Sequence, residues 1–131
     1  MRVDVYLNFR GNCRDAFRFY EEHLGGKLTS IMLHSDSPQG ASLPPEFRDK
    51  VLHARLELGG MTVMGADIPN AEPMRSAYLT MRVDSAEEAE KLYALMIDGG
   101  EVFMKMEKTF FANRFAMFRD RFGTSWMLLN E

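Results

Sequence analysis

The chain has 131 residues, which is enough to form one hydrophobic core but too few for two independent ones. Hydrophobic residues make up 46% and charged residues 27%, and the formal net charge is −3, so a globular domain with no broad attraction to nucleic acid or to an anionic membrane is expected. The only cysteine, Cys13, cannot form an intrachain disulfide, and the first residues do not resemble a signal peptide, so we expect a single cytoplasmic domain over residues 1–131.

The first half predicts one strand, one helix and three further strands. The helix follows Asn12, a typical N-cap residue, and ends at Gly25-Gly26, because glycine adopts the left-handed C-terminal conformation at little cost. Residues 35–50 are rich in proline and predict a loop with room for one helical turn. The strand-like runs cover residues 3–9, 28–34, 51–58 and 61–65.

The second half predicts the same order of elements. Ser85 and Glu88 have the spacing of a capping box, and Gly99-Gly100 ends the helix that they begin. Apolar residues recur at helical spacing between these signals, at Ala89, Leu92, Tyr93 and Met96. The strand-like runs cover residues 78–83, 101–106, 114–119 and 125–129.

The matching order indicates an internal repeat. Tyr6 and Tyr78 are 72 positions apart, Gly25 and Gly99 are 74 apart, and Gly60 and Gly123 are 63 apart. The drop in offset places an extra loop in the first half. We therefore predict an α+β fold of two tandem βαβββ modules, residues 1–70 and 75–131 approximately. Their strands would form an eight-stranded, cleft-shaped mixed sheet with the helices on its outer face, and small ligands bind in such clefts.

One strand shows which side chains would face the cleft. In residues 51–58 the apolar residues Leu52, Ala54, Leu56 and Leu58 alternate with His53, Arg55 and Glu57, so the two sets point to opposite faces. The polar set either contacts a ligand or forms a solvated strand face or a dimer rim. His53 and Glu57 cannot jointly bind a metal ion, because four residues of strand separate their Cα atoms by about 13 Å.

Other chemical motifs are weak. No HExxH, CxxC, GxSxG, P-loop or GxGxxG pattern occurs. Cys13 lies in a helix first turn but has no base partner, so an unreactive thiol is the better interpretation. Residues 109–127 place aromatic rings near Arg114, which indicates either an apolar pocket with one cation or core and dimer interface. Asp120 and the net charge argue against a nucleic-acid surface there.

These motifs resemble the PhnB-like branch of the glyoxalase/bleomycin-resistance/dioxygenase superfamily, the vicinal oxygen chelate proteins. The resemblance covers nearly the whole chain and rests on Leu7-Asn-Phe, on the helix end at residues 19–26, on residues 53–60 and above all on residues 114–126. It implies paired βαβββ modules that form a cleft, usually in a homodimer. Metal-using members bring His, Gln or Glu ligands from the first strand of each repeat and from the closing strands. The resemblance places these positions at Val5, Tyr78 and Met127, which are not metal ligands.

We therefore expect a metal-free, cofactor-free protein that binds a small, mostly apolar or aromatic molecule. The candidate ligand-binding residues are His53, Arg55, Glu57, Tyr78, Arg114 and Met127, with Val5 in the same cleft. The alternatives are a divergent metal-dependent lyase, isomerase or dioxygenase, in which a divalent metal is the cofactor, a metal-free enzyme with His53 or Glu57 as general base, and a partner-binding module. The expected partners are the small molecule and a second copy of the chain, with neither nucleic acid nor a membrane.

Overall fold

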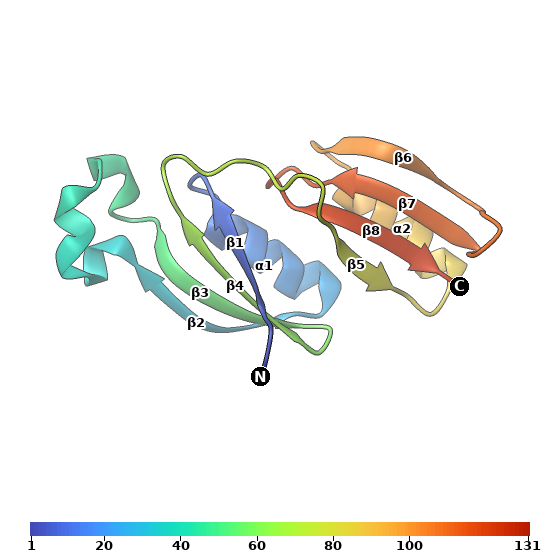
Figure 1. Ribbon diagram of the computed structural model, residues 1–131, viewed down its shortest axis with the longest axis horizontal. Coiled ribbons are helices and arrows are strands. Elements are labelled where there is room, and N and C mark those ends of the chain that lie inside the picture. Colours follow the sequence, from blue (N-terminus) through green and yellow to red (C-terminus); the bar gives the residue numbers. More distant parts are fainter. The chain divides into compact units, whose positions relative to one another are not determined.

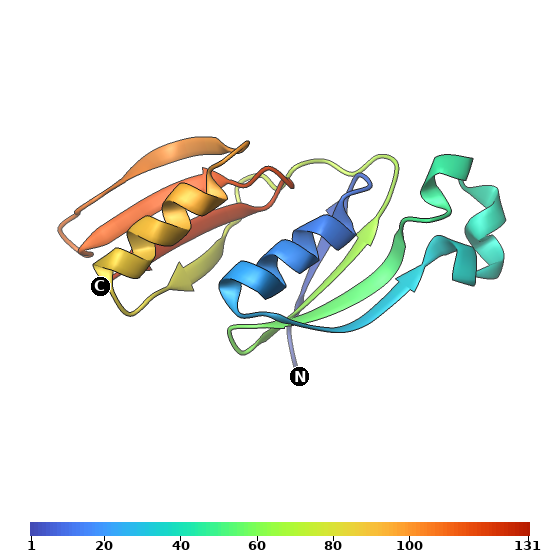
Figure 2. The same cartoon turned by 180° about the vertical axis from the view of Figure 1, so that it is seen from behind.

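The computed structural model describes all residues from Met1 to Glu131, which form two compact units, Met1–Glu72 (unit 1) and Pro73–Glu131 (unit 2). Each unit has one four-stranded mixed sheet and one helix across one face of that sheet (Figures 1 and 2). The prediction of an α+β fold built from tandem βαβββ modules is therefore confirmed. Neither helix is long and apolar enough to cross a membrane.

Unit 1 forms a sheet in the order β1-β4-β3-β2, in which β1 runs parallel to β4 and the other pairs are antiparallel. Its elements are β1 (Val5–Phe9), α1 (Cys13–Leu24), β2 (Lys27–Leu33), β3 (Val51–Leu58) and β4 (Met61–Asp67). The helix lies close against this sheet at Gly65, where an added Cβ would come within 2.7 Å of Phe17 Cζ. Ala54 and Leu56 lie fully buried on the same helix-covered face.

Unit 2 repeats this arrangement in the order β5-β8-β7-β6, again with one parallel pair at β5 and β8. Its elements are β5 (Leu79–Arg82), α2 (Ala86–Met96), β6 (Glu101–Glu107), β7 (Arg114–Arg119) and β8 (Ser125–Asn130). The ring of Tyr93 on α2 contacts Phe118 on β7 at a centroid distance of 6.1 Å. Phe118 and its strand partner Trp126 are buried, so they form the core between the helix and the sheet.

Two helix ends follow the predicted signals and two do not: Asn12 does not cap α1 with its side chain, and α2 ends at Met96 with Ile97 as its C-cap, before the predicted Gly99-Gly100. Gly25 caps α1 in the left-handed conformation with φ 75°, and Ser85 Oγ accepts a hydrogen bond of 3.0 Å from Glu88 N at the start of α2. Asn12 occupies the N-cap position of α1, but its side chain makes no capping hydrogen bond. Asp67 of β4 holds this end of the helix instead, because its Oδ1 accepts from Gly11 N at 2.9 Å and from Cys13 N at 3.0 Å.

The segment between β2 and β3 contains more structure than the expected loop with one turn. It forms three short 3₁₀ helices, η1 (His34–Asp36), η2 (Pro38–Ser42) and η3 (Pro45–Phe47). His34 is buried, and its Nε2 lies 2.8 Å from the carbonyl oxygen of Asp67. Val51 N donates to Asp67 Oδ2 at 2.8 Å where the chain re-enters the sheet. The segment is thus fixed at both ends to the last residue of β4.

The sheet registers correct one of the repeat offsets. Tyr6 lies opposite Met64 in unit 1, whereas Thr80 lies opposite Met127 in unit 2. Met64 and Met127 are 63 positions apart, in agreement with the two glycines that precede these strands. The residue equivalent to Tyr6 is therefore Thr80 and not Tyr78, so the offset is 74, the same as for the glycines that follow the helices.

Candidate functional site

Each sheet turns one face away from its helix, and we call these surfaces the open faces of unit 1 and unit 2. Strand registers and side-chain alternation assign residues to them. The open face of unit 1 carries Tyr6, Asn8, His53, Arg55, Glu57, Thr62 and Met64. The open face of unit 2 carries Thr80, Phe115, Met117, Arg119, Met127 and Leu129.

β3 shows the alternation that its sequence predicted over residues 54–57. Ala54 and Leu56 are fully buried under α1, whereas the side chains of Arg55 and Glu57 are 47% and 45% exposed. His53 is half-buried on the same face as these two charged residues. Three predicted site residues therefore lie together on the open face of unit 1.

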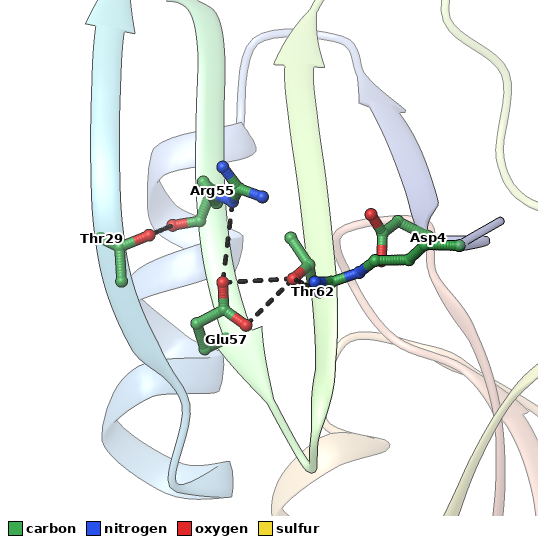
Figure 3. Close-up of polar contacts among 6 residues, drawn as sticks. Asp4, Thr29, Arg55, Glu57 and Thr62 are labelled. Carbon is green, nitrogen blue, oxygen red and sulfur yellow. Dashed lines mark hydrogen bonds and ion pairs between the residues drawn. The ribbon is translucent and has the colours of Figure 1, made fainter.

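A chain of polar contacts fixes the carboxylate of Glu57 (Figure 3). Thr62 Oγ1, which belongs to a fully buried residue of β4, lies 3.0 Å from Glu57 Oε2 and 3.2 Å from Oε1. Arg2 Nη2 donates to Thr62 Oγ1 at 2.6 Å, and Arg2 Nε donates to Asp4 at 3.0 Å. Arg55 Nε lies 3.6 Å from Glu57 Oε1, which is an ion pair but too long for a good hydrogen bond.

Tyr6 is a candidate site residue that the sequence interpretation missed. Its hydroxyl lies 3.4 Å from His53 Nδ1, and the two rings are 5.8 Å apart. Burial, and secondarily the charge that a Cys13 thiolate would carry, raises the pKa of the Tyr6 hydroxyl, so it stays protonated at neutral pH. Val5, which was expected at this place, pairs with the buried Val63 and lies on the helix-covered face. The alternation of polar Tyr6 and Asn8 with apolar neighbours was the available signal.

Tyr78 and Met127 lie in unit 2. Met127 packs with Met117 against the cluster of Ala112, Phe115 and Leu129, and its Sδ lies 3.8 Å from Thr80 Oγ1. Tyr78 contacts the ring of Phe103 edge-on, with the centroids 6.4 Å apart. The guanidinium of Arg119 in turn lies 5.1 Å from the centroid of Phe103. This unit thus presents a mainly apolar and aromatic surface.

Arg119 and Arg82 lie on this open face, whereas Arg114 does not. Arg114 donates from Nε to Glu90 of α2 at 2.8 Å and from Nη1 to Asn113 O at 2.7 Å, so its side chain lies on the helix-covered face. Arg119 donates from Nε and Nη2 to Met74 O, at 3.2 and 2.9 Å, and from Nη1 to Glu101 at 3.2 Å. Arg114 is therefore placed away from the surface for which the sequence suggested it.

The strands that would supply metal ligands do not fit a divalent ion. Strands β1, β4, β5 and β8 contain no His or Glu and a single Asp, Asp67, whose carboxylate accepts three backbone N–H groups. Within neither unit do three His, Cys, Asp or Glu side chains gather closely enough to hold a metal ion. Cys13 is fully buried, and burial together with the nearby Asp67 carboxylate raises its pKa, so its thiol is not an available nucleophile.

Residues 2–128 match the model of the Glyoxalase/Bleomycin resistance protein/Dioxygenase superfamily. The chain is 30% identical to Protein YjdN of Escherichia coli (strain K12), over 98% of this chain and 94% of that one. The structure of protein PA1353 from Pseudomonas aeruginosa is 40% identical and superimposes with a TM-score of 0.86, covering 100% and 98% of the two chains.

A PhnB protein from Bacillus cereus, described as a putative 3-demethylubiquinone-9 3-methyltransferase, has the same fold. It is 21% identical, with a TM-score of 0.85 and complete coverage of both chains. The predicted superfamily is thereby confirmed by the family model, and this PhnB protein shares the fold of the chain. On these matches, the chain belongs to the glyoxalase/bleomycin resistance protein/dioxygenase superfamily.

Proposed function

We propose that this protein binds a small, mostly apolar or aromatic molecule on the open faces of its sheets, without a metal ion. One observation carries this proposal. The open faces display aromatic and polar side chains, while the strands that bring metal ligands in the superfamily carry one carboxylate, Asp67, which is occupied by backbone donors. A site of this composition suits recognition by apolar contact and a few hydrogen bonds.

The two open faces offer different contacts, and each is a candidate binding surface by itself. In unit 1, Tyr6, His53 and Arg55 present hydrogen-bonding groups, and Glu57 orders the charged end of this face through Thr62. In unit 2, Tyr78 and Met127 present apolar surface. Arg114 has no part in the proposal, because its side chain is engaged by Glu90.

We also propose that the protein acts as a homodimer in the cytoplasm. Strands β2 and β6 leave large apolar side chains about 40–50% exposed, among them Met32 at 48% and Phe103 at 41%. Phe110, between β6 and β7, is fully exposed. Apolar surface of this kind is typical of protein interfaces. Sedimentation equilibrium should give twice the chain mass, and a monomer at micromolar concentration would contradict the dimer.

Binding is tested by a thermal-shift screen of small aromatic and apolar compounds. A ligand at 100 times its dissociation constant stabilises the folded state by about 2.7 kcal/mol, which is readily measured as a raised melting temperature. We expect His53→Ala and Met127→Ala each to reduce the shift. The control is Glu22→Gln on the exposed side of α1. The proposal fails if no compound stabilises the protein, or if both variants respond like wild type.

Metal analysis of the purified protein tests the proposal that binding needs no metal ion. We expect no divalent ion in stoichiometric amount. A stoichiometric ion would overturn the metal-free proposal in favour of a metal-dependent lyase, isomerase or dioxygenase.

A further inference from the structure

We propose that Met127 is an oxidation site and that its sulfoxide turns the apolar open face of unit 2 polar, so that an apolar ligand is released. The oxidant is hydrogen peroxide. Release of a ligand rests on the proposed binding function, whereas oxidation of Met127 does not depend on it. The two parts are therefore tested separately.

Three methionines lie in one row across the sheet of unit 2. Met104 of β6 is opposite Met117 of β7, and Met117 is opposite Met127 of β8. Side chains at such paired positions point to the same face of the sheet, with Cβ atoms about 4.5–5.5 Å apart. The row ends at Thr80 of β5, which is opposite Met127. Thioether side chains therefore cross three neighbouring strands of this open face.

The row is more accessible than the methionines of the core. Met104 is 42% exposed, and Met117 and Met127 are half-buried. Met96 and Met106, in contrast, are only 0% and 7% exposed. Because peroxide oxidises the thioethers that it reaches, we expect the row to react before these two buried residues.

The oxidation step is simple and reversible. A lone pair of the Met127 sulfur attacks one oxygen of hydrogen peroxide, the O–O bond breaks, and the other oxygen takes up the released proton and leaves as water. Sulfur loses two electrons in this step, and peroxide gains them. The product is a polar methionine sulfoxide, which methionine sulfoxide reductases convert back to methionine.

Thr80 gives the new oxygen a hydrogen-bond donor. Its Oγ1 lies 3.8 Å from Met127 Sδ, so the hydroxyl is already beside the reacting atom. A thioether is a weak acceptor, whereas the oxygen of a sulfoxide is polar and accepts well. Met127 is therefore the methionine of the row whose oxidised form the sheet should stabilise.

The sulfoxide would change the surface on which an apolar ligand is proposed to bind. Met127 and Met117 pack against the cluster of Ala112, Phe115 and Leu129, so their thioethers continue an apolar surface. Beyond the bond to Thr80, the sulfoxide oxygen would accept a hydrogen bond from water. An apolar ligand would displace this water without replacing its hydrogen bond, which costs affinity.

Peptide mass spectrometry of the folded full chain during peroxide treatment tests the oxidation site. Met127 sulfoxide should form several-fold faster than the sulfoxides of Met96 and Met106. Thr80→Val removes the donor, so it should lower the melting temperature of the oxidised protein more than that of the untreated protein. Oxidation of Met127 at the rate of the buried methionines, or an equal effect of Thr80→Val on both forms, would overturn the proposal.

Binding of 1-anilinonaphthalene-8-sulfonate, an apolar aromatic dye, tests the switch. Oxidised wild type should bind the dye about tenfold more weakly than untreated protein, a change of about 1.4 kcal/mol. Met127→Gln places a polar side chain of similar length at this position and should bind weakly without peroxide. Met127→Leu cannot be oxidised there, so peroxide should weaken its binding much less. The matched control is Met61→Leu, which removes a 43% exposed methionine outside the row and should respond to peroxide as wild type does.

Circular dichroism should show that every variant and every oxidised sample is folded. The switch is overturned if oxidised wild type binds the dye as tightly as before, or if peroxide weakens binding equally in Met127→Leu and Met61→Leu. If untreated protein binds neither the dye nor any compound of the thermal-shift screen, the proposed function fails and ligand release fails with it. In that case the mass spectra still decide whether Met127 is the oxidation site.

Discussion

Replacing Asp67 by asparagine tests the account of how unit 1 is held together. The carboxylate is 1% exposed and accepts backbone N–H groups from Gly11, Cys13 and Val51, at 2.9, 3.0 and 2.8 Å. Asparagine retains one acceptor oxygen and turns an NH₂ group toward at least one of these donors. Leaving one buried donor unsatisfied costs about 1–3 kcal/mol, and exchanging a charged for a neutral acceptor at the other two costs about 1 kcal/mol each. We therefore expect Asp67→Asn to lower the free energy of unfolding by about 3–5 kcal/mol.

Urea unfolding followed by far-UV circular dichroism measures this loss. Circular dichroism is required because the only tryptophan, Trp126, lies in unit 2 and need not respond to unit 1. The control is Asp36→Asn, which weakens one exposed hydrogen bond to Leu33 N and should cost less than about 1 kcal/mol. Trypsin should also cleave Asp67→Asn faster after Arg48, because Asp67 anchors the preceding segment. A variant within 1 kcal/mol of wild type would refute this description of Asp67.

Three further predictions concern the core and the site. The pKa of Cys13 is raised above its ordinary 9.0 in the folded protein, so ionisation of the thiol favours the unfolded chain. From pH 8 to pH 10 the free energy of unfolding of wild type should therefore fall by about 1.4 kcal/mol relative to Cys13→Ala. Identical pH profiles for the two proteins would contradict this. Gly65→Ala should destabilise by about 1–3 kcal/mol in urea, because its Cβ would contact Phe17 and backbone; a neutral effect would show that α1 is free to shift. EDTA should leave the melting temperature and ligand affinity unchanged, and a drop of several degrees would reveal a bound ion that the strands do not account for.

The strands were predictable from sequence where one face is apolar and the other polar. β3 and β7 agree with the sequence prediction at both ends, and the N-cap at Ser85 was correct, because local side-chain chemistry determines each of them. Asn12 failed as a cap because a carboxylate from β4, 55 positions later in the chain, bonds the same end of the helix. No local pattern reports a partner that distant.

The site was predicted less well because a shift of one residue reverses the face of a strand. The family resemblance places the first-strand position at Val5, whereas the open face carries its neighbour Tyr6. The aromatic residues around Arg114 suggested a pocket, but β7 carries apolar residues on both faces, so its alternation does not identify the helix-covered side. The ion pair with Glu90 of α2 shows that the Arg114 side chain points to the helix-covered face.

The sheet registers show how far the two halves of the repeat have diverged. With Met64 equivalent to Met127, Arg55 corresponds to Met117 and Glu57 to Arg119. The same backbone position therefore carries a cation in one half and a thioether in the other. A protein made by joining two copies of unit 1 would keep the topology but double its polar recognition groups and lose its apolar surface. The two units thus share one sheet topology, and their open faces carry different chemistry.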